Sequence, residues 1–112
     1  MLRYYGLIRI STLIVTFKTR KLEKCYFTYK KAVKAFGDQV AKKYIQRINV
    51  IEETEDLDEL CTLPVLRCHP LTGNRQGQYA IKLTGFYRLI FTMEEDSLTV
   101  VKIEEVSKHY DD

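Results

Sequence analysis

Cysteine, proline and tryptophan are scarce in this chain of 112 residues, which has three cysteines, two prolines and no tryptophan. The cysteines, Cys25, Cys61 and Cys68, are odd in number and widely spaced, and none forms a Cys-x-x-Cys pair. Disulfide-rich secreted domains and structural zinc sites both need paired cysteines at characteristic spacings. The sequence therefore argues against a disulfide framework and against a structural zinc site, and it predicts reduced thiols in a cytoplasmic protein.

A hydrophobic run long enough to cross a membrane is also missing. The most apolar stretch, MLRYYGLIRISTLIVTF, is interrupted by Arg9 and is shorter than the ~20 apolar residues of a spanning helix. It is not followed by a small-residue cleavage site of the kind that ends a secretory signal. We therefore expect no membrane partner and a single domain over residues 1–112, with residues 1–12 either disordered or an extra N-terminal extension.

The signatures of several common enzyme sites are absent. The chain contains no GxxxxGK[ST] phosphate loop, no HExxH pair and no GxSxG turn. Its two histidines, His69 and His109, are too few for a typical metal site unless carboxylates join them, and their sequence neighbours do not suggest this. We therefore expect a function that uses neither a metal nor a cofactor.

Charge of one sign is missing from several segments, although the net charge is only +3. Residues 18–47 hold ten Lys or Arg against two acids, residues 52–59 hold six acids and no base, and residues 67–88 hold four cations and no acid. Such runs are usually solvated helix faces. Two separated basic segments on a small domain nevertheless make nucleic acid the leading charged partner.

The first half of the chain predicts a strand at Leu13 to Phe17 and then helices. Thr19 can cap a short helix over Arg20 to Phe27, and Gly37 is suited to end a second one over Tyr29 to Phe36 in the left-handed conformation. Asp38 can then cap the main helix. That helix has an apolar stripe of Val40, Tyr44, Ile45, Ile48 and Ile51, and an opposite basic side of Lys42, Lys43, Gln46 and Arg47.

The second half of the chain reads as strands and tight loops. Val65 to His69 has β-type residues, Gln78 to Leu83 alternates, and Phe86 to Met93 is mostly apolar. Thr84-Gly85 divides the last two runs, which predicts an antiparallel hairpin. A final strand is expected over Leu98 to Val106. This order indicates an α+β domain, with a small antiparallel sheet and helices packed on one of its faces.

The residues best suited to catalysis lie in the basic segment 67–88 and near the end of the chain. RNA supplies its own nucleophile, the 2′-hydroxyl, so a metal-free nuclease needs a proton acceptor, a proton donor and a cation for the phosphate. An imidazole can perform either proton transfer, and a guanidinium holds phosphate oxygens through paired bonds. His69, His109 and Arg88 can fill these roles. Each also has a purely structural explanation, such as an ion pair between Arg88 and Glu104.

The string LRCHPLTGNRQGQYAIKLTGFYRLIF resembles the central signature of HigB-type toxins in the RelE/ParE superfamily. That signature is approximately Arg-x-His-Pro-Leu, a loop with two glycines, a strand, and then an aromatic residue before Arg-Leu-x-Phe. FKTRKLEKCY and IEEVSKHYD are similar to that family's first helix and last strand. The resemblance covers Leu13 to Tyr110 and implies the RelE-like fold, a compact antiparallel sheet with helices packed against it.

The resemblance implies the toxin of a type II toxin–antitoxin system, a ribosome-dependent endoribonuclease that enters the A site and cuts messenger RNA without a cofactor. The implied partners are a helix-turn-helix antitoxin similar to HigA, the ribosome and messenger RNA, with operator DNA bound only through the antitoxin complex. Carried over by position, the family's catalytic residues are His69, Arg88 and His109. Further RNA contacts are expected from Arg67, Thr72, Arg75, Lys82, Lys108 and Tyr110, and a weaker ribosome contact from Lys42, Lys43 and Arg47.

Position 72 departs from the family's pattern. Many relatives have a lysine three residues after the first histidine, whereas this chain has Thr72, which brings a hydroxyl but no charge. Stabilisation of the transition state should then fall on Arg88, with help from Arg75, Lys82 or Lys108. Our hypothesis is that Lys108 compensates.

Two other functions fit the same fold. ParE-like members bind and inhibit DNA gyrase, and they generally lack the set represented here by His69, Arg88 and His109, so this set favours the nuclease. A catalytically inactive toxin homologue would act as a co-repressor with its antitoxin. The sequence does not distinguish which histidine accepts the proton and which donates it.

Overall fold

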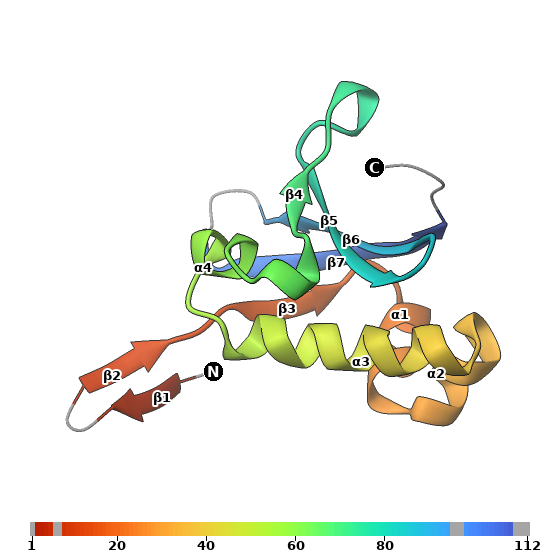
Figure 1. Ribbon diagram of the computed structural model, residues 1–112. Coiled ribbons are helices and arrows are strands. Elements are labelled where there is room, and N and C mark those ends of the chain that lie inside the picture. The colour runs from red at the N-terminus through yellow and green to blue at the C-terminus, as the bar shows by residue number, and fades with distance from the viewer. Residues whose placement is uncertain (1, 6–7, 95–97, 109–112) are drawn as a thin grey trace.

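Five strands form the central sheet of the molecule (Figure 1). In spatial order they are β3 (Ile14–Phe17), β7 (Val100–Lys108), β6 (Tyr87–Met93), β5 (Gln78–Thr84) and β4 (His69–Pro70). The computed structural model describes residues 2–5, 8–94 and 98–108. The predicted hairpin is confirmed as β5 and β6, which pair antiparallel around Gly85.

The sheet is antiparallel from β4 to β7, as the sequence predicts, and β3 adds a parallel edge. Ile14 pairs with Val100 and Phe17 with Ile103, in the same chain direction. Parallel neighbours need a long crossover connection, and here residues 18–99 lie between the two strands. The α+β class is confirmed, and the first strand is placed beside the last one.

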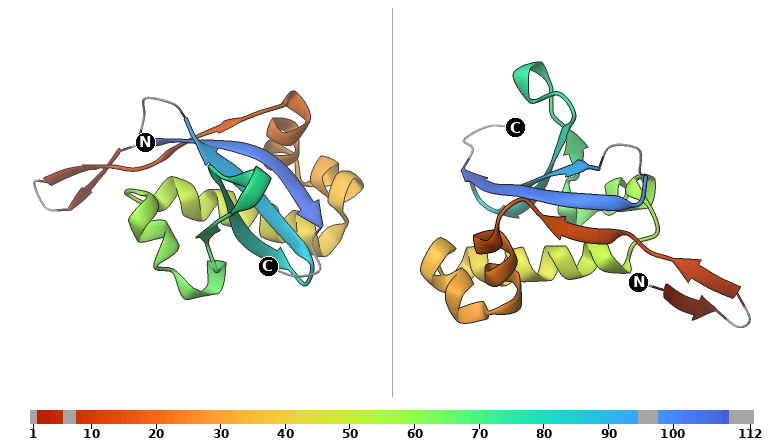
Figure 2. Two further views of the ribbon diagram at one scale, coloured as in Figure 1. Left: turned by 90° about the horizontal axis from the view of Figure 1, so that it is seen from above. Right: turned by 180° about the vertical axis from the view of Figure 1, so that it is seen from behind.

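Helices α1 (Arg20–Phe27), α2 (Tyr29–Phe36) and α3 (Asp38–Glu53) lie against one face of the sheet, as Figures 1 and 2 show. The short α4 (Leu57–Cys61) follows them. The Thr19 hydroxyl accepts a hydrogen bond from the Leu22 amide at 3.2 Å, which confirms the predicted cap of α1. None of the helices in the described part of the chain is both long and apolar enough to cross a membrane.

The junction between α2 and α3 differs from the prediction. Gly37 has a φ of 85° but an extended ψ of 164°, so its conformation is not the left-handed helical one. Asp38 is the first residue of α3, and Gly37 takes the position of the cap. Because a single residue joins the two helices, there is no room for a separate capping side chain. The Asp38 carboxylate instead accepts from the Tyr29 hydroxyl and lies 3.6 Å from the Lys42 ammonium.

The predicted apolar stripe of α3 forms the centre of the core. Tyr44 and Ile48 have no exposed surface, and the Tyr44 hydroxyl donates to the Leu22 carbonyl oxygen at 2.7 Å. Burial raises the pKa of the Tyr44 phenol, so this group stays a neutral donor. The stripe packs with sheet residues in one continuous cluster that includes Ile81, Leu83, Leu89, Phe91, Val101 and Ile103.

Arg47 is buried, which corrects its predicted place on the exposed basic side of α3. Only 6% of its surface is exposed, and its Nε donates to the Lys82 carbonyl oxygen at 3.1 Å. Tyr44, Arg47 and Ile48 stand at the i, i+3 and i+4 positions of one helix face, so position 47 belongs to the stripe. The strand ladder is irregular between Lys82 and Thr84, where this side chain binds the backbone.

Residues 64–70 also differ from the predicted strand. Pro64–Leu66 form a 3-10 turn, Arg67 follows in the left-handed conformation with φ 50° and ψ 38°, and β4 has only two residues. A proline at the first position of a helical turn has its φ already set. Burial nevertheless alternates here as it does along a strand, because Leu66 and Cys68 are buried while Arg67 is exposed.

The N-terminal residues form a separate element. β1 (Leu2–Tyr5) and β2 (Ile8–Ser11) pair antiparallel in a two-stranded sheet of their own. Figures 1 and 2 show this hairpin projecting away from the central sheet beyond β3. The first strand of the central sheet is therefore β3.

Glu104 of β7 contacts a residue of β6, a residue of its own strand, and Lys18, which follows β3. It accepts a hydrogen bond from the Thr92 hydroxyl at 2.9 Å, and the ammonium groups of Lys18 and Lys102 each lie 3.5 Å from one of its oxygens. Burial alone would raise the pKa of this carboxyl, but the Thr92 bond and the two lysines outweigh it and hold the pKa below its ordinary value of 4.5. The ionised form is thus the one that the fold favours.

We expect Glu104→Gln to lower the free energy of unfolding by about 1 kcal/mol at pH 7. A group whose pKa is lowered by folding stabilises above its unfolded pKa, and that contribution is lost as the pH falls. The difference from wild type should therefore shrink as the pH drops below about 4.5. Urea denaturation at pH 7 and at lower pH measures this, with Glu55→Gln, at an exposed position between α3 and α4, as the matched control. An equal difference at both pH values would contradict the assignment.

Candidate active site

The face of the sheet opposite the helices carries two rows of side chains that cross the strands. Residues paired directly across a ladder point to the same face, and alternate residues along a strand share it. Ile81 and Leu89 belong to the helix-side core, so their strand neighbours point the other way. One row runs His69, Ala80, Ile90 and Glu105, and the next runs Lys82, Arg88 and Ser107.

Arg88 is held at the end of the β5–β6 hairpin. It is only 8% exposed, and its Nη1 donates to the carbonyl oxygens of Gly85 at 2.8 Å and of Tyr87 at 3.0 Å. These carbonyls belong to the turn and to the start of β6, so the turn fixes where the guanidinium lies. Lys82 stands directly opposite Arg88 across the ladder. The hairpin thus places two cations, the half-buried Lys82 and the buried Arg88, next to each other on the face opposite the helices, which we call the open face.

His69 is oriented by the turn that precedes β4. Its Nδ1 lies 2.7 Å from the Arg67 carbonyl oxygen. A carbonyl only accepts, so this contact assigns the proton of the neutral ring to Nδ1 and leaves the lone pair on Nε2. His69 pairs with Ala80, one row from Lys82 and Arg88. Strand spacings put the Cα atoms of His69 and Arg88 roughly 12 Å apart, a gap that two long side chains can close around a phosphodiester.

Arg75 is engaged by an acid that the sequence analysis did not assign to the site. Arg75 ends the 3-10 turn Gly73–Arg75, and its Nη2 donates to Glu105 Oε2 at 3.0 Å. Its Nη1 donates to Gln78 Oε1 at 3.1 Å. The segment from residue 67 to 88 has no acid of its own, but β7 brings Glu105 onto the same face. Part of the Arg75 charge is therefore neutralised within the protein.

The other predicted RNA contacts are spread around this face. Arg67 and Thr72 are exposed on the segments before and after β4. Lys108 pairs with Tyr87, and its Nζ lies 5.9 Å from the Tyr87 ring centroid. Cross-strand pairing puts Lys108 on the side of Tyr87, whereas Arg88 shares its side with Lys82. The predicted site residues His109 and Tyr110 lie outside the described residues.

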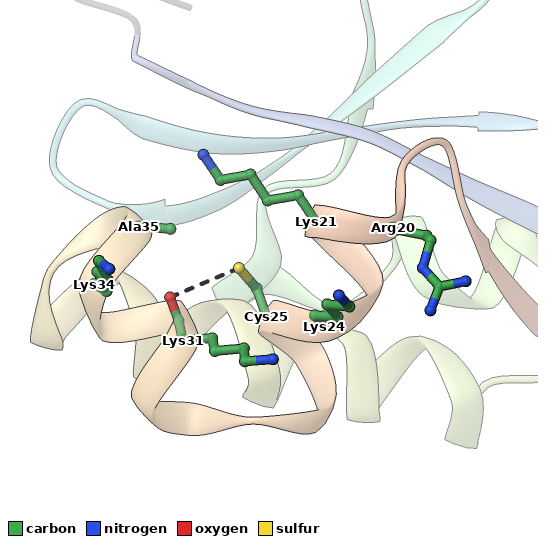
Figure 3. Close-up of a pocket in the computed structure, with 7 residues that line it drawn as sticks. All are labelled: Arg20, Lys21, Lys24, Cys25, Lys31, Lys34 and Ala35. Atoms are coloured by element: carbon green, nitrogen blue, oxygen red, sulfur yellow. Dashed lines mark hydrogen bonds between the residues drawn. The ribbon is translucent and has the colours of Figure 1, made fainter.

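A second basic site, which the sequence analysis did not single out, lies between α1 and α2 (Figure 3). Thr28 alone joins these helices, so they turn sharply and leave a cavity of about 450 Å³ between them. The buried Cys25 contributes to the cavity wall, with its Sγ 3.8 Å from the Lys31 carbonyl oxygen. The cationic residues around the cavity are Arg20, Lys21, Lys24, Lys31 and Lys34. The signal in the sequence was the density of Lys and Arg in this stretch.

The basic side of α3 is weaker than the sequence indicates. Lys42 is exposed but lies beside Asp38, Lys43 is half-buried, and Arg47 is inside the core. The largest group of cations on the helices is therefore the one between α1 and α2. Among the residues that the structure describes, no three His, Cys, Asp or Glu side chains gather as potential metal ligands.

The fold matches solved toxin structures at low sequence identity. The YoeB–YefM complex from Staphylococcus aureus is 21% identical with a TM-score of 0.56, and the match covers 89% of this chain and 100% of that one. The YoeB/ParE toxin from Agrobacterium tumefaciens is 13% identical with a TM-score of 0.59, covering 88% and 100%. YafQ from E. coli strain BL21(DE3) is 14% identical with a TM-score of 0.54, covering 87% and 93%. These likenesses establish the fold.

The sequence itself identifies the family. No curated protein matches the chain. Residues 15–104 match the sequence model of the HigB-like toxin family, described as the RelE-like toxin of the type II toxin–antitoxin system HigB. The matched region begins in β3 and ends in β7, so it contains the whole hairpin with Arg88 and the strand with His69. The chain therefore belongs to the HigB-like family of RelE-like toxins of type II toxin–antitoxin systems.

Proposed function

We propose that this toxin is a ribosome-dependent endoribonuclease that cleaves messenger RNA without a metal or cofactor. The observation that carries the proposal is the arrangement on the open face, where Arg88 and Lys82 stand side by side one row from His69. A phosphodiester attracts paired cations, and an imidazole beside it can transfer the proton of a 2′-hydroxyl. The family membership supports RNA as the substrate.

His69 serves as the general base in this mechanism. Its Nδ1 is held by the Arg67 carbonyl, so Nε2 is the atom that takes the proton of the 2′-hydroxyl. The 2′-oxygen then forms a bond to the adjacent phosphorus, and the bond from phosphorus to the 5′-oxygen breaks. His109 is proposed to protonate that departing oxygen. The products are a 2′,3′-cyclic phosphate and a 5′-hydroxyl end.

Arg88 and Lys82 stabilise the negative charge that builds up on the phosphate. The guanidinium is preorganised by the turn carbonyls and needs little rearrangement when the substrate binds. Lys82, rather than Lys108, supplies the charge that Thr72 does not provide, because Lys82 shares a face and a ladder position with Arg88. Arg67, Thr72 and Tyr110 remain proposed contacts to the neighbouring nucleotides.

The cations between α1 and α2 are proposed to bind ribosomal RNA, with Lys42 and Lys43 as weaker contacts. Phosphate contacts release counterions, so the affinity for ribosomes should fall steeply with salt. We expect the triple variant Lys24→Gln, Lys31→Gln, Lys34→Gln to bind ribosomes at least ~10-fold less tightly at low salt and to show a shallower salt dependence.

Co-sedimentation with ribosomes at several salt concentrations measures this effect. The matched control is Lys30→Gln, an exposed lysine of α2 that does not line the cavity. It should bind nearly as well as wild type. Wild-type binding and an unchanged salt slope in the triple variant would show that the ribosome is bound elsewhere.

The proposed partners follow from the family and from the solved relatives. The Staphylococcus aureus YoeB structure is a complex with YefM. We propose that this toxin is likewise neutralised by a cognate antitoxin, similar to HigA, and that it reaches operator DNA only through that complex. The proposed location is the cytoplasm, where ribosomes and messenger RNA are available.

Mapping transcript 5′ ends after induction tests the function. Wild type should produce new ends with 5′-hydroxyl groups inside translated regions, and Arg88→Ala should not. Intact transcripts together with a DNA-damage response would identify a gyrase inhibitor instead. Normal growth combined with operator binding alongside the antitoxin would identify an inactive co-repressor.

A further inference from the structure

Two of the three cysteines meet beside the strand that carries His69. Cys61 ends α4, and Cys68 immediately precedes β4. Their Sγ atoms lie 2.8 Å apart, and both are free thiols. Cys25 belongs to α1 and faces the cavity between α1 and α2 instead. The chain thus contains one thiol pair in contact and one thiol apart from it.

The distance between the two sulfur atoms is close to that of a covalent bond. A disulfide has a sulfur–sulfur distance of ~2.05 Å, so the two sulfurs need to approach by only roughly 0.8 Å. The segment between them contains the 3-10 turn Pro64–Leu66 and the left-handed Arg67, which fold the chain back on itself. The two residues are thus seven positions apart in the sequence and in contact in the fold.

The two thiols differ in environment, which gives them different chemical roles. Cys61 is partly exposed, whereas Cys68 is 8% exposed. Burial, followed by the hydrogen bond to Cys61, raises the pKa of the Cys68 thiol, so the buried Cys68 keeps its proton, whereas Cys61 is the sulfur that solvent reaches. Cys61 is therefore the sulfur that meets an oxidant, and Cys68 is the one placed to resolve the product.

We propose that Cys61 and Cys68 form a thiol-oxidation site that hydroperoxides convert to a reversible intramolecular disulfide. The Cys61 thiolate attacks one peroxide oxygen, which gives a sulfenic acid and releases water or an alcohol after protonation. The Cys68 sulfur then attacks the Cys61 sulfur, the sulfur–sulfur bond forms, and the sulfenic oxygen leaves as water. The thiols are oxidised by two electrons in total, and the peroxide is reduced.

The disulfide would enclose the turn that orients His69. The Arg67 carbonyl, which holds the His69 ring, lies inside the loop between the two cysteines. Closing such a loop restricts the unfolded chain, so oxidation should raise the melting temperature by about 5 °C or more. Any effect of the disulfide on His69 as a general base rests on the proposed nuclease function. The oxidation of the two thiols does not rest on that function.

Peptide mapping of the full chain after brief exposure to hydrogen peroxide tests the proposal. Trypsin cleaves after Arg47, Arg67 and Arg75, so Cys61 and Cys68 fall on separate peptides, 48–67 and 68–75. With remaining thiols blocked by iodoacetamide, we expect these peptides to be joined, to separate on reduction, and Cys25 to carry the blocking group. The oxidised chain should also melt at the higher temperature.

Single serine variants supply the controls. Cys61→Ser and Cys68→Ser should lose both the joined peptides and the thermal shift, and Cys25→Ser should keep both. Three results would each overturn the proposal. They are over-oxidation of Cys61 without the joined peptides, disulfide links between two chains, and thiols that stay unreacted at peroxide concentrations that oxidise free cysteine. Joined peptides from a protein that cuts no RNA would leave the oxidation site standing and remove only the nuclease.

Discussion

Arg88→Ala should reduce messenger RNA cleavage by ~10²- to 10³-fold, the loss typical of removing one preorganised donor from a developing oxyanion. Arg88 is fixed by the carbonyls of Gly85 and Tyr87, and it stands beside Lys82 on the open face. Its removal takes away both charge and a planar pair of donors that a phosphate can use. Single-turnover cleavage of a defined messenger RNA on ribosomes measures the effect.

Three variants separate catalysis from folding and from the neighbouring charges. Arg88→Lys keeps the positive charge but not the planar pair of N–H donors, so most of the activity should still be lost. Lys82→Ala should lose more activity than Lys108→Ala, because Lys82 alone of the two shares the face of Arg88. Circular dichroism and thermal melting check that each variant is folded. Wild-type cleavage by Arg88→Ala, or a larger loss from Lys108→Ala than from Lys82→Ala, would refute this assignment.

His69→Gln should lower the cleavage rate by ~10²- to 10⁴-fold, the usual contribution of a positioned general base. It should also change the dependence on pH. A base acts in its unprotonated form, so the wild-type rate should fall as acid protonates the imidazole, and the variant should lose that acid limb. Rates measured across a pH series on ribosome-bound messenger RNA provide the comparison.

Arg67→Ala is the matched control for His69. The His69 ring is held by the backbone carbonyl of Arg67, which the substitution retains, so the acid limb of the pH profile should persist. The exposed Arg67 side chain is removed, which should weaken RNA binding without changing the proton transfer. A pH profile that is unchanged in His69→Gln would move the role of base to another group.

Features encoded by neighbouring residues were predictable from the sequence. The cap by Thr19, the first two helices and the hairpin around Gly85 depend on residues a few positions apart, and the structure confirms them. Alternation along a strand likewise places Arg88 and Leu89 on opposite faces, and of the two only Leu89 belongs to the helix-side core. Local sequence patterns carry this information because caps, turns and strand faces have short periods.

Features that depend on contacts between distant segments were not predictable. The ion pair between Arg75 and Glu105 requires the register of β7 against β6, which no local pattern specifies. Arg47 was assigned to a basic surface because of its charge, although its position on the helix belongs to the apolar stripe. The sequence hypothesis chose Lys108 to compensate for Thr72, whereas strand pairing places Lys82, and not Lys108, beside Arg88.

The parallel pairing of β3 with β7 determines when the toxin becomes complete during its own synthesis. Residues 14–17 are synthesised early, yet their pairing partners are residues 100–103, so this edge of the sheet stays unpaired until that later segment has left the ribosome. Contacts between segments so far apart close a large loop and form slowly. The nascent toxin therefore cannot complete its central sheet before residues 100–103 have also been synthesised and have emerged.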